Sequence, residues 1–214
     1  LSPNHSGLRT EQIDRISPHC VVGQCTAEGL GDWFHKSSTK ASSNYGIDKN
    51  GRIGLYVEEK NRSWCTSSNA NDQRAVTIEC ASDKAEPYAM HQVVYDRLVD
   101  LCEDICRRNG KKKLLWFGDK NKSLNYQPKA DEMLITVHRW FANKSCPGDW
   151  LYARLGDLAA KVTSRLGSGN VEVIPSGMQA GEFQGLTEEQ VLAKVGPLFT
   201  ADQKKSGIPA SVSM

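Results

Sequence analysis

The continuous apolar run Met133–Val137 (MLITV) constrains the fold of this chain most strongly. A strand with one face in water alternates apolar and polar residues, whereas a strand covered on both faces is apolar throughout. Strands of the second kind belong mainly to parallel sheets that carry helices on both faces. The run therefore predicts an α/β fold.

The rest of the sequence up to residue 166 alternates predicted strands and helices. The longest predicted helix covers residues 86–109, because Val94, Leu98, Leu101 and Ile105 lie on one helical face. The dipeptide Asn50–Gly51 predicts a hairpin, since it accommodates the positive φ angles of a tight turn. We expect a mixed, mostly parallel central sheet flanked by helices. The predicted elements are strands at 16–23, 75–80, 114–117 and 133–137, a hairpin over 45–57, and helices at 28–36, 86–109 and 150–166. In the last helix the residues expected to face inward are Leu151, Leu155, Leu158 and Val162.

The predicted domain organisation has three parts. The α/β domain occupies residues 1–166, and residues 167–185 are rich in glycine without a helical period, which predicts a linker. A helical pattern resumes over residues 186–214, where Thr187 is a candidate N-cap. This tail lacks the apolar residues of a complete domain, so we expect it to be the truncated start of a second one.

Charge and hydropathy exclude two classes of partner. Lys and Arg number 27 against 25 Asp and Glu, and a net charge of +2 does not predict a nucleic-acid partner. No stretch approaches the roughly 18 consecutive apolar residues of a membrane span.

No signal peptide is recognisable at the first residues. The sequence leaves the oligomeric state open.

Two residues near the end of the apolar run predict a site of chemical interest. His138 directly follows the run, and Cys146 lies eight residues further on. Ligands of α/β proteins gather outside the carboxyl ends of such strands. A catalytic zinc takes three protein ligands and keeps one open position, and His19 on the first predicted strand is the natural third ligand. Alternatively, Cys146 is a nucleophilic thiolate with His138 as its base. A third interpretation is a hydrogen-bonded histidine beside an inert cysteine, and the spacing alone decides between none of the three.

Four segments occur in a distinctive order: ISPHCVVGQ from Ile16, ASSNYGIDKNGRIGLYVEEKNRSWC from Ala41, AVTIECAS from Ala75, and TVHRWFANKSCPGDWLYARLG from Thr136. Together they resemble the zinc-dependent N-acetylmuramoyl-L-alanine amidases of the amidase-2 type, which include phage endolysins, bacterial autolysins and peptidoglycan recognition proteins. The resemblance covers residues 16–166. It implies hydrolysis of the amide between the lactyl group of N-acetylmuramic acid and L-alanine in bacterial peptidoglycan. It also implies action at the cell wall, after secretion or after release during phage lysis.

The resemblance assigns roles to individual residues. It implies His19, His138 and Cys146 as the ligands of one Zn²⁺ ion. Glu79 matches a carboxylate suited to general-base work, and Lys144 matches a lysine that holds positive charge against the oxyanion. The alternative is a non-catalytic peptidoglycan-binding module on the same fold. Cys146 argues against this alternative, because members that only recognise peptidoglycan commonly lack the cysteine.

Further expectations concern the substrate groove and the tail. Some phage relatives carry a catalytic tyrosine where this chain has Ser43, so no tyrosine acid is assigned. Residues 186–214 resemble the opening of a glucosaminidase domain, with a helical tail that docks on the amidase as the alternative. The candidate substrate contacts are Asn44, Trp64, Ser67, Ser68 and Asn69.

Overall fold

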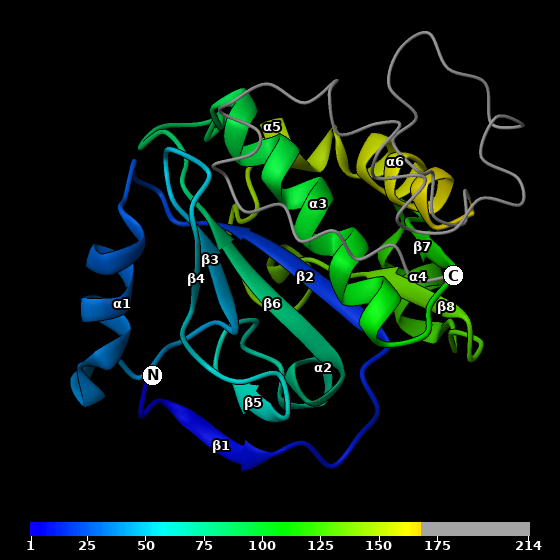
Figure 1. Ribbon diagram of the computed structural model, residues 1–214, viewed down its shortest axis with the longest axis horizontal. Coiled ribbons are helices and arrows are strands. Elements are labelled where there is room, and N and C mark those ends of the chain that lie inside the picture. The colour runs from blue at the N-terminus through cyan, green and yellow to red at the C-terminus, as the bar shows by residue number, and fades with distance from the viewer. Residues whose placement is uncertain (168–214) are drawn as a thin grey trace, which may run out of the picture. The chain divides into compact units, whose positions relative to one another are not determined.

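Residues 1–167 are the part of the chain that the computed structural model describes. The predicted linker, except for Gly167, and the predicted tail 186–214 lie outside the described residues. Within residues 1–167 the main sheet has six strands in the order β4-β3-β6-β2-β8-β7 (Figure 1). β4 runs antiparallel to β3 and the other neighbouring pairs are parallel, which confirms the predicted mixed, mostly parallel sheet. The strands are β2 (Arg15–Cys20), β3 (Tyr45–Ile47), β4 (Ile53–Leu55), β6 (Ala75–Cys80), β7 (Lys113–Leu115) and β8 (Glu132–Ile135).

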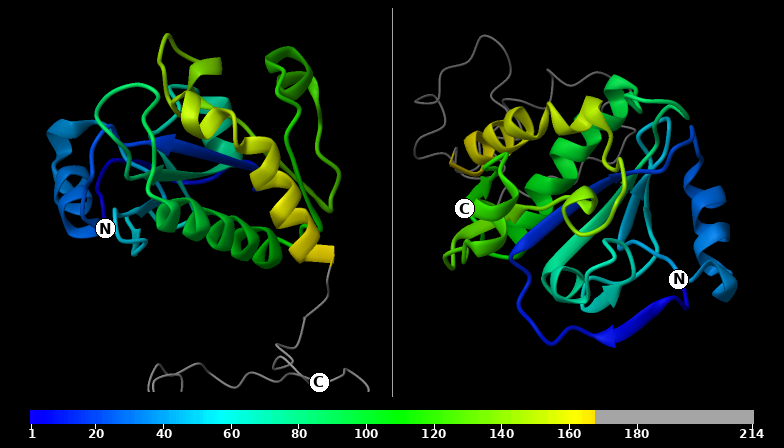
Figure 2. Two further views of the ribbon diagram at one scale, coloured as in Figure 1. Left: turned by 90° about the horizontal axis from the view of Figure 1, so that it is seen from above. Right: turned by 180° about the vertical axis from the view of Figure 1, so that it is seen from behind.

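Helices surround this sheet, and a small two-stranded sheet lies below it in Figure 1. Helix α3 runs along one face of the main sheet and packs against α6, while α1 contacts the edge strand β4 (Figures 1 and 2). The small sheet pairs β1 (His5–Leu8) with β5 (Asn61–Ser63). The helices are α1 (Ala27–His35), α2 (Asn69–Arg74), α3 (Gln92–Arg108), α4 (Lys120–Asn125), α5 (Asp149–Tyr152) and α6 (Leu155–Gly167).

The face of the sheet toward α3 is apolar. Ile16 in β2 and Ile78 in β6 are fully buried in one cluster with Leu98 and Cys102 of α3. Burial of each large aliphatic side chain contributes about 1.5–3 kcal/mol, so this cluster supplies most of the driving force for docking α3. The predicted inward face of α3 is confirmed, because all four of its residues are buried: Val94, Leu98, Leu101 and Ile105.

The opposite face carries a buried hydrogen-bond network. Ser17 Oγ and Thr136 Oγ1 are 2.6 Å apart, and Asn71 of α2 donates to Ser17 Oγ at 3.1 Å. Thr136 donates in turn to Asn71 Oδ1 at 3.0 Å, and Thr77 Oγ1 lies 2.8 Å from Ser63 Oγ. A buried polar group without a partner costs about 1–3 kcal/mol, so these matched partners fix the register of the elements that meet here. The network lies beside the residues of the candidate site.

Two predicted helices differ from the observed ones. α3 begins at Gln92 rather than at residue 86, because residues before it form a turn in which Tyr88 has a φ of 54° and the Pro87 carbonyl accepts the Trp150 amide. The helix predicted over 150–166 is two helices with a break after Tyr152. Its four inward residues are nevertheless fully buried, as predicted.

β2 also ends earlier than predicted, at Cys20, since Val22 adopts a left-handed φ of 60° that no strand continues through. Among the helices of residues 1–167, none is long and apolar enough to cross a lipid bilayer.

Candidate metal centre

The candidate site lies at the carboxyl ends of three neighbouring parallel strands. His19 and Glu79 are the penultimate residues of β2 and β6, and their Cα atoms are paired in the sheet. Partners in register point to the same face, so the two side chains lie together on the polar side. His138 follows β8 after two residues and begins the short 3₁₀ turn His138–Trp140. The parallel strand order thus brings together residues that are distant in the sequence.

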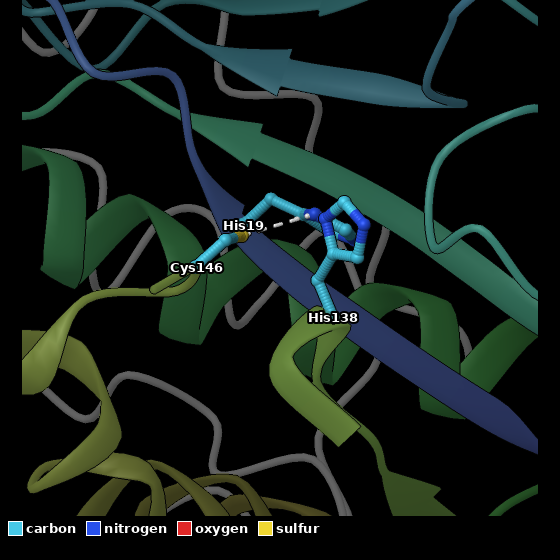
Figure 3. Close-up of side chains that lie close together, drawn as sticks. All are labelled: His19, His138 and Cys146. Atoms are coloured by element: carbon cyan, nitrogen blue, oxygen red, sulfur yellow. Dashed lines mark hydrogen bonds between the residues drawn. The ribbon is translucent and has the colours of Figure 1, made fainter. Parts of the chain in front are cut away.

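His19, His138 and Cys146 form a compact cluster (Figure 3). One ligand atom of each residue lies within 4.8 Å of the other two, and Cys146 Sγ is 3.2 Å from His19 Nδ1. Ideal tetrahedral zinc geometry separates a nitrogen and a sulfur ligand by about 3.5 Å. His19 Nε2 is buried and has no hydrogen-bond partner among residues 1–167. The donor types and the spacing of Cys146 Sγ and His19 Nδ1 fit a zinc ion.

The surroundings of the cluster keep its ligands uncharged. Burial, and then the charge of His138, lower the pKa of His19 to about 3. Burial, and then the charge of Lys144, lower the pKa of His138. A hydrogen bond with the Cys20 thiol and burial raise the pKa of the Cys146 thiol well above its ordinary value. Neutral imidazole is the form that binds metals, and such a thiol ionises at neutral pH only when a cation binds it.

Glu79 borders the cluster. Its Oε1 is 4.0 Å from His19 Nδ1 and accepts a hydrogen bond from the Cys65 thiol at 3.8 Å. Its Oε2 is buried and has no hydrogen-bond partner in the described part of the chain. Burial raises the pKa of Glu79 to about 8, and the hydrogen bond from Cys65 opposes this shift. A carboxyl group with an unpartnered oxygen and a pKa near neutrality suits proton transfer.

Arg139 holds the loop that carries Cys146. Its backbone amide donates to the Cys146 carbonyl at 3.1 Å, and its guanidinium donates to Asp149 Oδ1 at 2.9 Å and to the Ser145 carbonyl. The guanidinium also stacks over the Tyr152 ring, 4.7 Å from its centroid. These contacts hold the loop at Ser145, at Cys146 itself and at Asp149.

Lys144 lies exposed on the same loop, two residues before Cys146. Its charge lowers the pKa of His138, so the ammonium group acts electrostatically on the cluster. The structure therefore gathers all five residues that the sequence nominated for catalysis and metal binding around one end of the sheet.

Three neighbours of the cluster have roles here that the sequence does not predict. Cys65 donates to Glu79, Arg139 binds the Cys146 loop, and Ser67 Oγ lies 2.9 Å from His138 Nε2. For Ser67 the sequence predicts only a substrate contact. No spacing or periodicity marks these three residues, because each acts through a tertiary contact.

Three of the predicted substrate contacts form hydrogen bonds within the protein. Asn44 is fully buried, and its amide donates to backbone carbonyl groups. The Trp64 indole donates to Ser6 Oγ at 2.7 Å, and Ser68 caps α2 by accepting the Asn71 amide at 3.3 Å. Asn44 in particular presents no accessible surface to a ligand, so the geometry gives it a structural role.

The tyrosine nearest to Ser43 is directed away from the cluster. Tyr45 donates its hydroxyl to Glu59 Oε1 at 2.8 Å, and Glu59 is paired with Arg108 at the end of α3. Tyr45 is in register with Ile78, on the α3 side of the sheet, whereas Glu79 faces the other side. This agrees with leaving a tyrosine acid unassigned.

Residues 9–149 match the family model described as N-acetylmuramoyl-L-alanine amidase. No curated protein matches the sequence. Among solved structures, a mutant endolysin from Bacillus subtilis has a TM-score of 0.54 at 11% identity, with 75% of this chain and 92% of that chain covered. The N-acetylmuramoyl-L-alanine amidase LysC from Clostridium intestinale has a TM-score of 0.51 at 13% identity, with 70% and 85% covered. The Drosophila peptidoglycan recognition protein SD has a TM-score of 0.52 at 19% identity, with 72% and 86% covered.

Proposed function

The chain belongs to the Amidase_2 family of N-acetylmuramoyl-L-alanine amidases, and we propose that it uses a single zinc ion to hydrolyse bacterial peptidoglycan. The bond cleaved is the amide between the lactyl group of N-acetylmuramic acid and the L-alanine of the stem peptide. The observation that carries the zinc assignment is the cluster of His19, His138 and Cys146 ligand atoms within 4.8 Å of one another. The proposed place of action is the bacterial cell wall.

The metal would be held by one thiolate and two neutral imidazoles, with one position left open. Zinc bound in such a set supplies Lewis acidity, which makes water a competent nucleophile near neutral pH. The buried, uncharged state of His19 and His138 supports this role, since neither imidazole must lose a proton before it binds a metal.

Glu79 is the proposed general base and later the general acid. Its unpartnered Oε2 is the acceptor for the proton of the attacking water. The same carboxyl group then returns that proton to the nitrogen of L-alanine, because an amide nitrogen leaves as an amine. The carboxyl group is regenerated as carboxylate at the end of the cycle.

Lys144 is the proposed partner of the oxyanion that forms on the scissile carbonyl. An ammonium group at the rim of a partly dry site stabilises such developing charge more than it stabilises the neutral ground state. The lysine is exposed and its charge reaches His138, which is consistent with a position beside the ligand cluster.

A thiol hydrolase based on Cys146 has less support. Thiol nucleophiles in hydrolases need a lowered pKa, and here the pKa of Cys146 is raised. The pKa of His138, the base in this alternative, is lowered, and His19 beside the sulfur has a pKa of about 3, so neither imidazole favours an imidazolium–thiolate pair. The remaining rival is a peptidoglycan-binding module without activity, and the fold itself is compatible with both.

Mass spectrometry of digested peptidoglycan tests the proposal. The protein is expected to release stem peptides that begin with L-alanine, and chelation followed by zinc should abolish and then restore this release. Cys146→Ser serves as the matched variant, because it removes one metal ligand with little change in volume. Intact peptidoglycan that nevertheless binds the zinc-loaded protein would show a recognition module. Glycan fragments with peptides still attached would show a different hydrolase.

A further inference from the structure

The hydroxyl group of Ser67 contacts one of the proposed metal ligands from outside the cluster. Ser67 Oγ is 2.9 Å from His138 Nε2, and Ser67 is the hydrogen-bond partner of this ring among residues 1–167. Figure 3 shows that one ring nitrogen of His138 turns toward His19 and Cys146 while the other turns away. Because Nε2 is engaged by Ser67, Nδ1 is the nitrogen that remains for a metal.

We propose that Ser67 is a positioning residue that fixes the orientation and the tautomer of the His138 imidazole. This inference rests on the proposed zinc function. A neutral imidazole carries its proton on one nitrogen and a lone pair on the other. When Nε2–H donates to the Ser67 hydroxyl oxygen, the lone pair stays on Nδ1, where the metal requires it.

The backbone at Ser67 indicates that a side chain is kept there despite its conformational cost. Ser67 has a φ of 61°, in the left-handed region that glycine occupies readily and other residues disfavour. The hydroxyl group is what serine offers at this position and glycine does not.

The residues on either side hold Ser67 firmly. Thr66 donates its hydroxyl to Asp72 Oδ1 at 2.6 Å, and its amide also donates to that carboxylate. Ser68 accepts the Asn71 amide and so begins α2. The Ser67 side chain therefore projects from a fixed segment, which lets a single hydrogen bond orient the ring.

The test compares Ser67→Gly with Ser38→Gly, which makes the same change at an exposed serine that follows α1. Ser67→Gly removes the hydroxyl and relieves the left-handed strain, so the variant is expected to fold with unchanged or greater stability. Its dissociation constant for zinc, measured by competition with a chromophoric chelator, should rise about 10–100-fold. Ser38→Gly removes a hydroxyl group outside the cluster, and its dissociation constant for zinc is expected to stay within about 3-fold of that of the unsubstituted protein.

A second readout does not depend on zinc. Long-range ¹H–¹⁵N spectra distinguish the two imidazole tautomers, and in zinc-free protein His138 is expected as the Nε2–H form. Ser67→Gly should convert this signal to a mixture, while Ser38→Gly should leave it unchanged. If the unchanged protein binds no zinc but the tautomer still depends on Ser67, the metal assignment fails and the positioning role stands. If Ser67→Gly alters neither the tautomer nor the zinc affinity, the proposal is overturned.

Discussion

Glu79 combines two properties that a purely structural carboxyl group rarely has. Its Oε2 is buried without a hydrogen-bond partner in the described part of the chain, and burial raises its pKa to about 8. A group in this state is costly to the fold unless a ligand, water or cation completes its surroundings. A positive charge bound beside His19 would lower the pKa of Glu79 and so favour the carboxylate form that a general base needs.

Glu79→Gln is expected to lower kcat by a factor of about 10²–10⁴, because the amide keeps the shape of the side chain but accepts no proton at the operating pH. Zinc content, measured by atomic emission, should be unchanged. Glu59→Gln is the matched control, since Glu59 pairs with Arg108 on the other side of the sheet. Full activity in Glu79→Gln, with release of L-alanyl stem peptides followed by chromatography, would remove Glu79 from the proton transfer.

Cys65 tunes that carboxyl group. The hydrogen bond from its thiol lowers the pKa of Glu79, against the larger upward effect of burial. In Cys65→Ala the pKa of Glu79 therefore rises, and the acidic limb of the pH profile of kcat/KM is expected to move to higher pH. Cys102→Ala, on the buried face of α3, is the control that weakens packing without moving this limb. An unmoved limb in Cys65→Ala would show that Cys65 does not act on the base.

At the scale of secondary-structure elements, the sequence predicts best where one pattern dominates. The hairpin around Asn50–Gly51, the buried strand β8 and the apolar face of α3 all appear as predicted. The small sheet of β1 and β5 and the helix α2 were not predicted, because these short polar segments are stabilised by partners rather than by their own periodicity. α2, for example, is tied down through Asn71 and Asp72, which bind residues of other segments.

The residues of the candidate site also differ in how well the sequence predicts them. His19, His138 and Glu79 follow strands whose parallel order is predictable, so their meeting at one edge of the sheet is predictable too. The roles of Cys65, Ser67 and Arg139 depend on how loops cross that edge. Residue type and spacing carry no signal of such contacts.

Asp48 stabilises the β3–β4 hairpin in a pH-dependent way. Burial alone would raise its pKa, but the amides of Arg52 and Asn50 and the Arg52 guanidinium outweigh this effect and lower it. A lowered pKa in the folded state adds stability above a pH of about 4, and this stability is lost as the pH falls further. Asp48→Asn is expected to cost about 1–3 kcal/mol at pH 7, and less in acid, as measured by urea unfolding.

The matched control for Asp48 is Glu28→Gln. Glu28 binds the same arginine, at 2.6 Å, but from an exposed position where ion pairs contribute little. It should leave the unfolding midpoint nearly unchanged. Equal losses in the two variants would show that the hairpin does not depend on the buried carboxylate.

The Cys146 loop depends on the planar guanidinium of Arg139. Arg139→Lys retains the charge but not the simultaneous contacts with Asp149, the Ser145 carbonyl and the Tyr152 ring. Zinc dissociation, followed with a chelating dye, is expected to accelerate about 10-fold or more. Arg165→Lys is the control, because Arg165 forms its ion pairs between α3 and α6. An unchanged dissociation rate in Arg139→Lys would mean that the loop is held without the guanidinium.

At the scale of the whole molecule, the reactivity of the seven cysteines tests whether metal binding and folding are coupled. All seven lie within residues 1–167 and are free thiols. Cys20, Cys80, Cys102 and Cys106 are buried, whereas Cys25, Cys65 and Cys146 are partly exposed. A metal ion bound at Cys146 would also stabilise the folded state, by about 4 kcal/mol when free zinc is a thousandfold above its dissociation constant.

Alkylation with iodoacetamide, mapped by peptide mass spectrometry, separates the zinc enzyme from a thiol enzyme. With zinc bound, Cys146 is expected to resist alkylation and activity to persist, because the metal occupies the sulfur lone pair. Chelation should expose Cys146 to slow alkylation, abolish activity and lower the melting temperature, while labelling of Cys25 stays constant as an internal reference. Activity lost in this way should not return when zinc is added, because the alkylated sulfur of Cys146 no longer binds the metal as a thiolate. Activity that survives chelation but is lost on modification of Cys146 would instead identify the thiol as the nucleophile.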